Sequence, residues 1–294
     1  MIQTLRNAWK IEDLRKKLIY TMFILFIVRL GSAIPVPFLD PTALKAMISS
    51  GGNLLGYLDV LTGGALSNAT LLALSISPYI TASIVIQLLT VAIPALERMA
   101  KNGEDGQKKL KKITRYTTVA LAVLQAFAFY TLFRNGYYAV TYTEGFAGVL
   151  TALAIIAAFT AGAMVVVWLG ERIDEKGIGN GISLIIFVGI VSRGPGGVYE
   201  LAQYFAQGPQ YYVLVPLVAV LFVLLIGFIV LMNNAERRIT VQYAKKVVGR
   251  KMYGGQSSYI PIKVNMSGVL PIIFASTFLA IPGTIKSFVD PMGT

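Results

Sequence analysis

Long apolar segments separated by short polar stretches dominate the pattern of this chain. We count seven of them, at residues 18–35, 74–94, 114–133, 148–170, 182–191, 212–232 and 268–285. Five run to about twenty residues, enough for a helix to cross ~30 Å of hydrocarbon at about 1.5 Å per residue. The fifth segment, residues 182–191, is too short alone and must borrow length from its flanks or lie tilted. The pattern predicts an all-α polytopic membrane protein with seven transmembrane helices.

Basic residues fall unequally on the two sides that these segments define. With the N-terminus inside the cell, the inside stretches carry 21 Lys and Arg and the outside stretches carry 4, while Arg29 within the first segment completes the 26. Such an asymmetry is typical of cytoplasmic loops. Most of the net charge of +12 therefore reports topology. The first segment exceeds the usual apolar region of a signal peptide and six more follow, so we expect a retained helix.

Composition excludes several classes of chemistry. The chain has no Cys and no His, which rules out disulfides, thiolate chemistry, Cys/His zinc sites and Ser–His dyads. No Asp, Glu or Lys lies near the middle of an apolar segment, where ion-coupled transporters normally need such groups. A Walker motif is also absent, so a hydrolytic cycle must come from a partner. We therefore expect neither an enzyme nor a cofactor, which leaves a pore with an apolar lining or a scaffold.

The first outside stretch, residues 35–70, is long and almost uncharged. A solvated loop of this size usually carries more charge. Two interpretations stay open: a re-entrant segment at the membrane boundary, or a loop packed on the outer face. The second helix begins around Pro78, which is tolerated near a helix start. Ile76, Ile80 and Ile84 recur at four-residue spacing and share one face, which by periodicity alone indicates lipid contact or core packing.

Shorter patterns predict local structure. The charged stretch 97–115 is typical of a solvated loop. Ala154, Ala158 and Gly162 have a spacing that lets helices approach closely. The glycine-rich run 177–181 favours a tight turn over a phosphate site, because no strand precedes it. Alternation over residues 239–243 predicts a β-hairpin within 234–264. Its basic tip suits RNA phosphates or an acidic protein surface, or it is plain positive-inside charge.

Ten motifs in chain order make the sequence resemble the SecY/Sec61-alpha family of channel subunits of the protein translocase, in its bacterial pattern. They are Arg29–Gly31, Ile34–Pro37, Thr62–Ser67, Ser77–Ile84, Gln87–Leu89, Trp168–Glu171, Gly177–Ser183, Arg237–Ile239, Tyr243–Lys245 and Lys263–Asn265. The match runs from about residue 5 to 288 without a gap. It implies a multi-pass protein of the bacterial cytoplasmic membrane with a cytosolic N-terminus, and a SecY-type bundle built from inverted halves.

The resemblance implies roles for three groups of residues in a channel that passes unfolded polypeptides. Family pore-ring positions fall on Ile76, Ile80, Ile182, Ile186 and Ile273. The family plug corresponds to about residues 54–70, and its core matches Leu61, Thr62, Gly63, Gly64, Ala65, Leu66 and Ser67. Polar positions of the lateral gate match Thr81, Gln125 and Asn265. A ring of branched aliphatic side chains can form a dewetted barrier to ions and still deform around a passing chain.

The resemblance also implies partners. They are the membrane subunits SecE and SecG, the motor ATPase SecA, the ribosome, signal sequences, unfolded precursors and the lipid bilayer. The implied cytosolic docking residues are Lys108, Lys109, Lys111, Lys112, Arg237, Arg238, Lys245, Lys246, Arg250 and Lys251.

Domain organisation follows from the same resemblance. Residues 1–192 match the N-terminal half, with helices one to five, and residues 193–294 match the start of the C-terminal half. The family has ten helices, so we expect the last three to be absent from this chain, which stops at Thr294. A small-solute transporter and a non-conducting scaffold are the alternatives. The first is disfavoured by the lack of a polar midplane site, and the second has no need of an uncharged plug or an isoleucine ring.

Overall fold

The computed structural model describes residues 9–50, 56, 59–60, 62–135, 139–205, 208, 211–241, 246–248, 251–253 and 258–265. These residues divide into two compact units, the first ending at Pro195 and the second beginning at Gly196. The predicted seventh helix, residues 268–285, lies outside the described residues.

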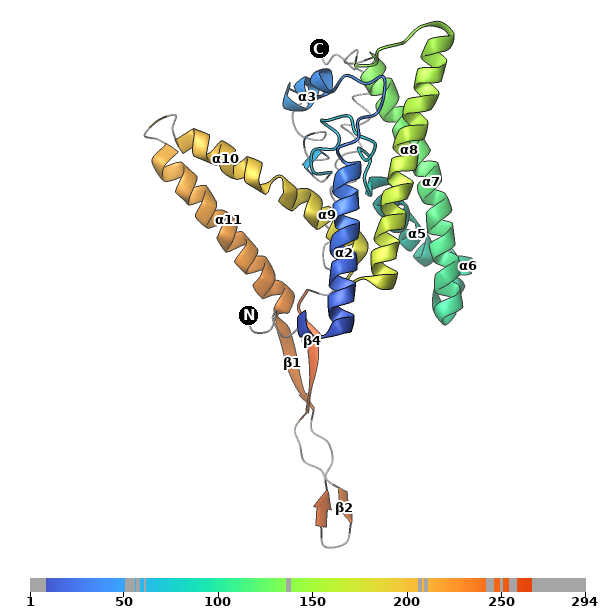
Figure 1. The fold of residues 1–294 in the computed structure, drawn as a ribbon. Helices are drawn as coiled ribbons and strands as arrows, with labels where there is room; N and C mark the ends of the chain where they lie inside the picture. The colour runs from blue at the N-terminus through green and yellow to red at the C-terminus, as the bar shows by residue number, and fades with distance from the viewer. Residues whose placement is uncertain are drawn as a thin grey trace. The chain divides into compact units, whose positions relative to one another are not determined.

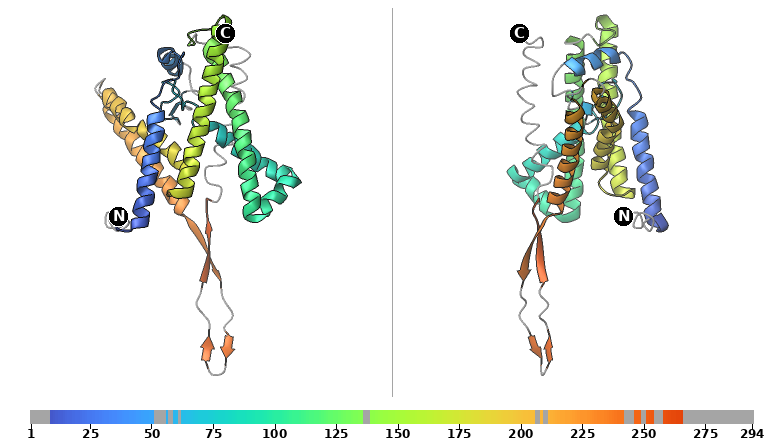
Figure 2. Two further views of the ribbon diagram at one scale, coloured as in Figure 1. Left: turned by 45° about the vertical axis from the view of Figure 1, so that its right-hand side comes forward. Right: turned by 90° about the vertical axis from the view of Figure 1, so that its left-hand side faces the viewer.

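Helices build the first unit (Figure 1). They are α2 (Glu12–Gly31), α3 (Pro41–Ser50), α5 (Ser77–Ala92), α6 (Pro94–Lys101), α7 (Gly103–Asn135), α8 (Gly145–Lys176) and α9 (Gly181–Ser192). α10 (Gly194–Phe205) carries the chain into the second unit. α7 and α8 run side by side and α5 packs on α7, as both views of Figure 2 show.

The charged stretch after α5 is helical, so the prediction of a solvated loop over residues 97–115 is wrong. Ile93 is extended because Pro94 follows it, and the chain bends by 103° between α5 and α6. α6 ends at Lys101, and α7 begins at Gly103, whose φ of +66° is open to glycine. Salt bridges at i,i+4 spacing support both helices, Glu97–Lys101 in α6 and Glu104–Lys108 in α7. The segment is nevertheless solvent-exposed, as expected.

Four helical stretches among the described residues are long and apolar enough to cross a membrane, or five if the bent α5–α6 pair is one span. They are Gly103–Arg134, Gly145–Lys176, Gly181–Phe205 and Tyr211–Asn234. Each of the four contains one predicted segment in full. The short fifth segment gains its length from α10, which lies between the fifth and sixth predicted segments. Residues 18–31 of the first predicted segment lie in α2, whose charged residues at both ends keep it out of this set.

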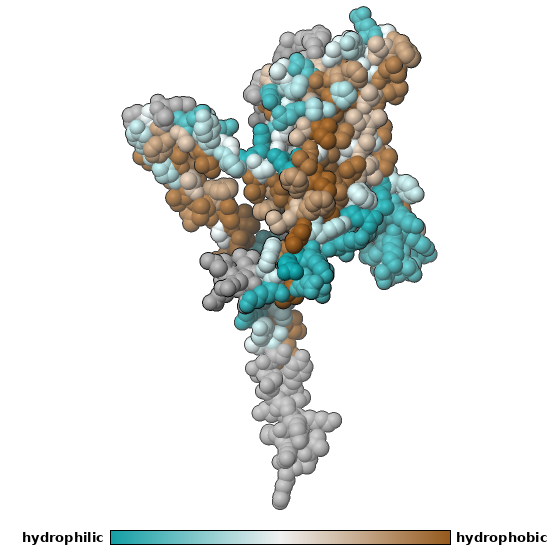
Figure 3. All heavy atoms as spheres, viewed as in Figure 1, coloured by the Kyte–Doolittle hydropathy of each residue, from teal (hydrophilic) through white to brown (hydrophobic). Residues whose placement is uncertain are grey.

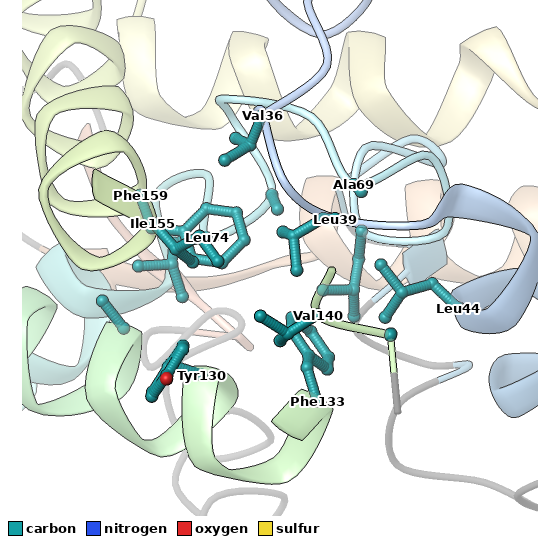
Figure 4. Packing of buried hydrophobic residues seen from close by; sticks show 14 of the residues in the cluster. Val36, Leu39, Leu44, Ala69, Leu74, Tyr130, Phe133, Val140, Ile155 and Phe159 are labelled. Carbon is teal, nitrogen blue, oxygen red and sulfur yellow. The ribbon is translucent and has the colours of Figure 1, made fainter. Parts of the chain in front are cut away.

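The larger apolar core of the first unit joins three helices to the chain between them (Figure 4). Phe133 of α7 and Phe159 of α8 are fully buried, with ring centroids 6.4 Å apart in an edge-to-face arrangement. Leu44 of α3 and Ala69 pack against the same cluster. Helices α3, α7 and α8 are therefore held together by close packing of aliphatic and aromatic side chains.

The second unit contains α11 (Tyr211–Asn234) and an antiparallel hairpin. β1 (Glu236–Val241) pairs with β4 (Ser258–Lys263) in the register Glu236↔Lys263, and β2 (Lys246–Val248) pairs with β3 (Lys251–Tyr253). This confirms the predicted hairpin. None of the apolar span of α11 is buried within the structure, although its residues are almost all aliphatic or aromatic. A helix that is hydrophobic all round needs lipid or other helices as its surroundings.

Surface hydropathy agrees with a membrane location. Brown apolar side chains cover the middle of the helices of the first unit in Figure 3, and teal covers α6 and the start of α7. Many large apolar side chains are exposed there, among them Phe127 of α7 and Leu153 of α8. A soluble protein rarely exposes apolar patches of this extent. The fold is thus a helical membrane bundle with a small two-stranded hairpin.

Candidate functional site

Four of the five predicted pore-ring residues lie in one apolar cluster. Ile76 directly precedes α5 and is 1% exposed, and Ile80 follows one turn later. Ile182 and Ile186 stand on α9. All four pack in a cluster that also contains side chains of α2 and α8, among them Val28. The structure therefore brings together residues about 100 positions apart in the chain. Ile273 lies outside the described residues.

A tight turn orients α9 toward this cluster, as its glycine run predicted. The side chain of Asn180 accepts a hydrogen bond from the Ser183 amide at 2.9 Å and caps the helix. Asp174 accepts from the Gly181 amide at 2.7 Å. Gly181 crosses α8 so closely that an added Cβ would stand 2.1 Å from the Gly170 carbonyl oxygen. Only glycine permits this approach, and the start of α9 is fixed by it.

Residues 62–70 of the predicted plug form a mostly buried, non-helical stretch between α3 and α5. Gly63 and Gly64 have φ of +67° and +87° and turn the chain back on itself. Leu66 is 2% exposed, and the Thr70 hydroxyl donates to the Ala65 carbonyl at 3.0 Å. The predicted members within the described residues are Thr62, Gly63, Gly64, Ala65, Leu66 and Ser67, and Leu61 lies outside them. Of the two interpretations left open for this stretch, burial among the helices favours a segment that re-enters the bundle.

One charged residue of this segment escaped the sequence reasoning. Asp59 is 1% exposed, and one carboxylate oxygen accepts from the Ser67 amide at 2.8 Å. The other accepts from the Arg193 guanidinium at 2.7 Å, which reaches it from the end of α9. Arg29 of α2 donates weakly to the Gly63 carbonyl at 3.4 Å. The sequence does mark this residue in one way, because Asp59 is the single charged residue between positions 46 and 70.

The predicted lateral-gate residues lie in α5, in α7 and just after β4. Thr81 of α5 donates to the Ser77 carbonyl of its own helix at 3.1 Å. Gln125 of α7 has its side-chain oxygen buried without a hydrogen-bond partner among the described residues. Asn265 donates to the Asn233 side chain at 2.7 Å within the second unit. α5 and α7 pack together, so Thr81 and Gln125 stand on neighbouring helices. No hydrogen bond joins the side chains of Thr81 and Gln125 in the part of the chain that is described.

The predicted docking residues at the start of α7 and on β1 are exposed. Lys108, Lys109, Lys111 and Lys112 are exposed at the start of α7, where Lys108 also pairs with Glu104. Arg237 and Arg238 are exposed on β1, and the Arg238 guanidinium stacks 4.8 Å from the Tyr259 ring centroid. Lys246 and Lys251 fall on β2 and β3, while Lys245 and Arg250 lie outside the described residues. Among those described, no group of three acidic, His or Cys side chains could hold a metal ion.

Comparison with known proteins decides the family. The family model for SecY matches residues 70–293, more than half of the chain. The chain belongs to the SecY family. The protein translocase subunit SecY of Streptomyces scabiei is 41% identical, with 98% of this chain and 68% of the relative covered. That of Buchnera aphidicola is 43% identical over 94% of this chain and 78% of the relative, and that of Thermotoga maritima is 42% identical over 99% and 68%.

Solved structures share the SecY-type fold. A protein-conducting channel superposes with a TM-score of 0.65 at 22% identity, covering 95% of this chain and 60% of that one. A second, from work on the plug domain of SecY and the closed state of the translocation channel, gives 0.64 at 21% identity, covering 95% and 59%. At these identities the likeness establishes the fold alone. This SecY-family chain thus spans about two thirds of its curated relatives and somewhat less of the solved channels.

Proposed function

We propose that this chain forms part of a protein-conducting channel, which exports unfolded precursors and inserts apolar segments laterally into the bacterial cytoplasmic membrane. The observation that carries the proposal is the convergence of Ile76, Ile80, Ile182 and Ile186 in one apolar cluster. These side chains come from two distant helices, and in a family of translocase subunits they match the pore ring. Ile273 is the fifth member of the proposed ring.

The chemistry of the cluster suits a seal that must yield to any sequence. Branched aliphatic side chains offer no hydrogen bonds to water or ions, so a narrow ring of them dewets. The same side chains give no sequence-specific contact to a passing polypeptide. Leu72, which follows the proposed plug, packs in this cluster too. The proposed plug, residues 54–70, therefore continues directly into the proposed constriction and closes it from the outer side.

The lateral gate is proposed at Thr81, Gln125 and Asn265. Uncharged polar groups between helices contribute below about 2 kcal/mol each, which a signal sequence can overcome. The buried, unpaired oxygen of Gln125 supports a contact made in another state or with another helix. The two inverted halves are proposed to meet near residue 192.

Partners follow from the exposed basic residues. We place the N-terminus, the start of α7 and the hairpin in the cytosol, on the side that carries most of the basic residues. The lysines of α7 and the arginines of β1 then form a docking face for SecA and the ribosome. SecE and SecG are the proposed membrane partners. A related mammalian channel, Sec61, has been solved in a ribosome-channel complex.

Site-specific photo-crosslinking tests this function. A photo-reactive residue replaces Ile80 in the protein in its native membrane, together with a stalled secretory precursor and the motor ATPase. The matched control is Leu153 of α8, which is 60% exposed on the apolar surface. We expect precursor adducts from Ile80 and none from Leu153. No adduct from Ile80 in a folded, inserted protein would remove the pore assignment, and stabilisation by a small solute would then favour a transporter.

A further inference from the structure

We propose that Asp59 and Arg193 form a latch that positions the plug, and that movement of α9 releases it. The latch rests on the proposed function, because it assigns a role to the residues that hold the plug closed. Asp59 lies within the plug, and Arg193 follows the last residue of α9. The two side chains are 134 positions apart and both belong to the first unit.

The geometry fixes the carboxylate from two sides. One oxygen of Asp59 accepts the Ser67 amide at 2.8 Å, and the other accepts the Arg193 guanidinium at 2.7 Å. Both distances are those of charge-assisted hydrogen bonds. The backbone carbonyl of Asp59 also accepts the Gly64 amide at 2.8 Å and the Thr62 hydroxyl at 3.1 Å. Asp59 therefore ties the turn of the plug together and fastens it to α9 at once.

Gly63 and Gly64 allow the turn to approach α9 closely, because a side chain at either position would meet atoms of its neighbours. An added Cβ on Gly63 would stand 2.8 Å from the Gly189 carbonyl oxygen of α9 and 2.9 Å from the Arg29 guanidinium. An added Cβ on Gly64 would lie 3.8 Å from Nε of Arg193. The turn at Gly63 and Gly64 thus packs against the C-terminal end of α9, next to Arg193.

The two partners of the ion pair differ in solvent exposure, which decides how the pair can break. Asp59 is 1% exposed, whereas the Arg193 side chain is 43% exposed. A buried carboxylate that loses its cation is costly, since its desolvation is no longer compensated. The guanidinium of Arg193, in contrast, can rotate into solvent with little loss of free energy, because its side chain is already partly exposed. Release therefore occurs by withdrawal of the arginine, with the plug free to leave afterwards.

α9 connects this latch to the proposed pore ring. The same helix carries Ile182 and Ile186 in the apolar cluster and ends next to Arg193. A polypeptide that pushes these isoleucines outward displaces α9 and draws Arg193 away from Asp59. Opening of the ring and release of the plug are thereby coupled through one rigid helix of twelve residues.

Cysteine labelling tests the latch without requiring translocation. The chain has no native cysteine, so Ser67→Cys gives a single reporter at a site that is 7% exposed. It is labelled with a maleimide in right-side-out and inverted vesicles of the protein with its native partners. Asp59→Asn keeps an oxygen for the Ser67 amide but loses the charge. We expect this variant and Arg193→Gln each to raise the labelling rate at least about tenfold.

Three controls separate a latch from general loosening. Arg134→Gln removes another arginine, which donates to the Thr143 carbonyl and is not part of the latch; it should leave labelling unchanged. Ala126→Cys in α7, at 0% exposure, should stay unlabelled in every variant that is folded. Arg193→Lys, which keeps the charge but not the planar fork, should restore part of the protection.

The outcomes are distinct. Unchanged labelling at Ser67→Cys in both latch variants would overturn the proposal. Labelling of Ala126→Cys as fast as that of Ser67→Cys in these variants would also overturn it, because it would indicate unfolding. Faster labelling combined with absent crosslinks from Ile80 would keep the latch and refute the channel function.

Discussion

Gly162 of α8 faces the backbone carbonyl of Leu71, and a Cβ added to Gly162 would stand 1.9 Å from that oxygen. The small residues of α8 predicted a close approach between helices, yet the chain that approaches here is the irregular segment before α5. This contact fixes the end of the plug segment to the face of α8.

We expect Gly162→Ala to destabilise the fold by roughly 1–3 kcal/mol, because backbone atoms must move to admit the methyl group. Thermal unfolding of the detergent-solubilised protein measures the loss. Gly227→Ala in α11 is the matched control, since an added Cβ there has no atom within 4 Å. It should be neutral or slightly stabilising, as alanine is the better helix former. Equal effects of both variants would contradict the close contact.

Gln125 has a buried side-chain oxygen without a partner among the described residues. Replacing it by Leu removes an unsatisfied acceptor, so we expect Gln125→Leu to be neutral or stabilising by up to about 1 kcal/mol. Unfolding in denaturant measures this. A clear loss of stability would contradict this expectation and would mean that the oxygen is already bonded in the resting protein.

The cap of α9 depends on the Asn180 side chain. Asn180→Ala leaves the Ser183 amide without its acceptor, and we expect a loss of about 1 kcal/mol in stability. Hydrogen exchange of the first turn of α9 should quicken. Ser183→Ala keeps the donating amide and is the control, with little expected change. Equal exchange rates in the two variants would mean that the Asn180 side chain does not stabilise the start of α9.

Asp40 precedes α3 and accepts hydrogen bonds from the Thr42 hydroxyl at 2.6 Å and the Thr42 amide at 2.8 Å. The first of these is the larger cause that lowers the pKa of Asp40 from its ordinary value of 3.8. Because the folded pKa is depressed, the contribution to stability is present above the unfolded pKa and is lost as pH falls through the folded one. We expect protection of the Thr42 amide to fall below about pH 4. Asp40→Ala should show no such step.

The sequence anticipated the elements whose pattern is long or local. Apolar segments of about twenty residues favour spanning helices. The glycines at 177–181 predicted a turn, and the alternation over 239–243 predicted a hairpin. The charged stretch 97–115 misled us because charge indicates exposure, while Glu, Lys and Leu at i,i+4 spacing also favour a helix.

Long-range contacts were beyond sequence pattern alone. Asp59 stood out only as a lone acid in an uncharged stretch, and its partner Arg193 lies 134 positions away. Periodicity grouped Ile76 with Ile80, but their meeting with Ile182 and Ile186 depends on how α5 and α9 cross α2 and α8. The family resemblance supplied that grouping, since packing between distant helices leaves no mark on either segment taken separately.

The 103° bend between α5 and α6 limits how far α5 can move along its own axis. α6 keeps Leu96 and Met99 partly covered and exposes Glu97, Arg98 and Lys101, so its two faces suit the boundary between lipid and water. Because α6 is attached to α5 at this angle, α5 cannot slide deeper into the bilayer without drawing the charged side chains of α6 into hydrocarbon. α5 therefore cannot sink without α6, which fixes the depth of Ile80 in the bilayer.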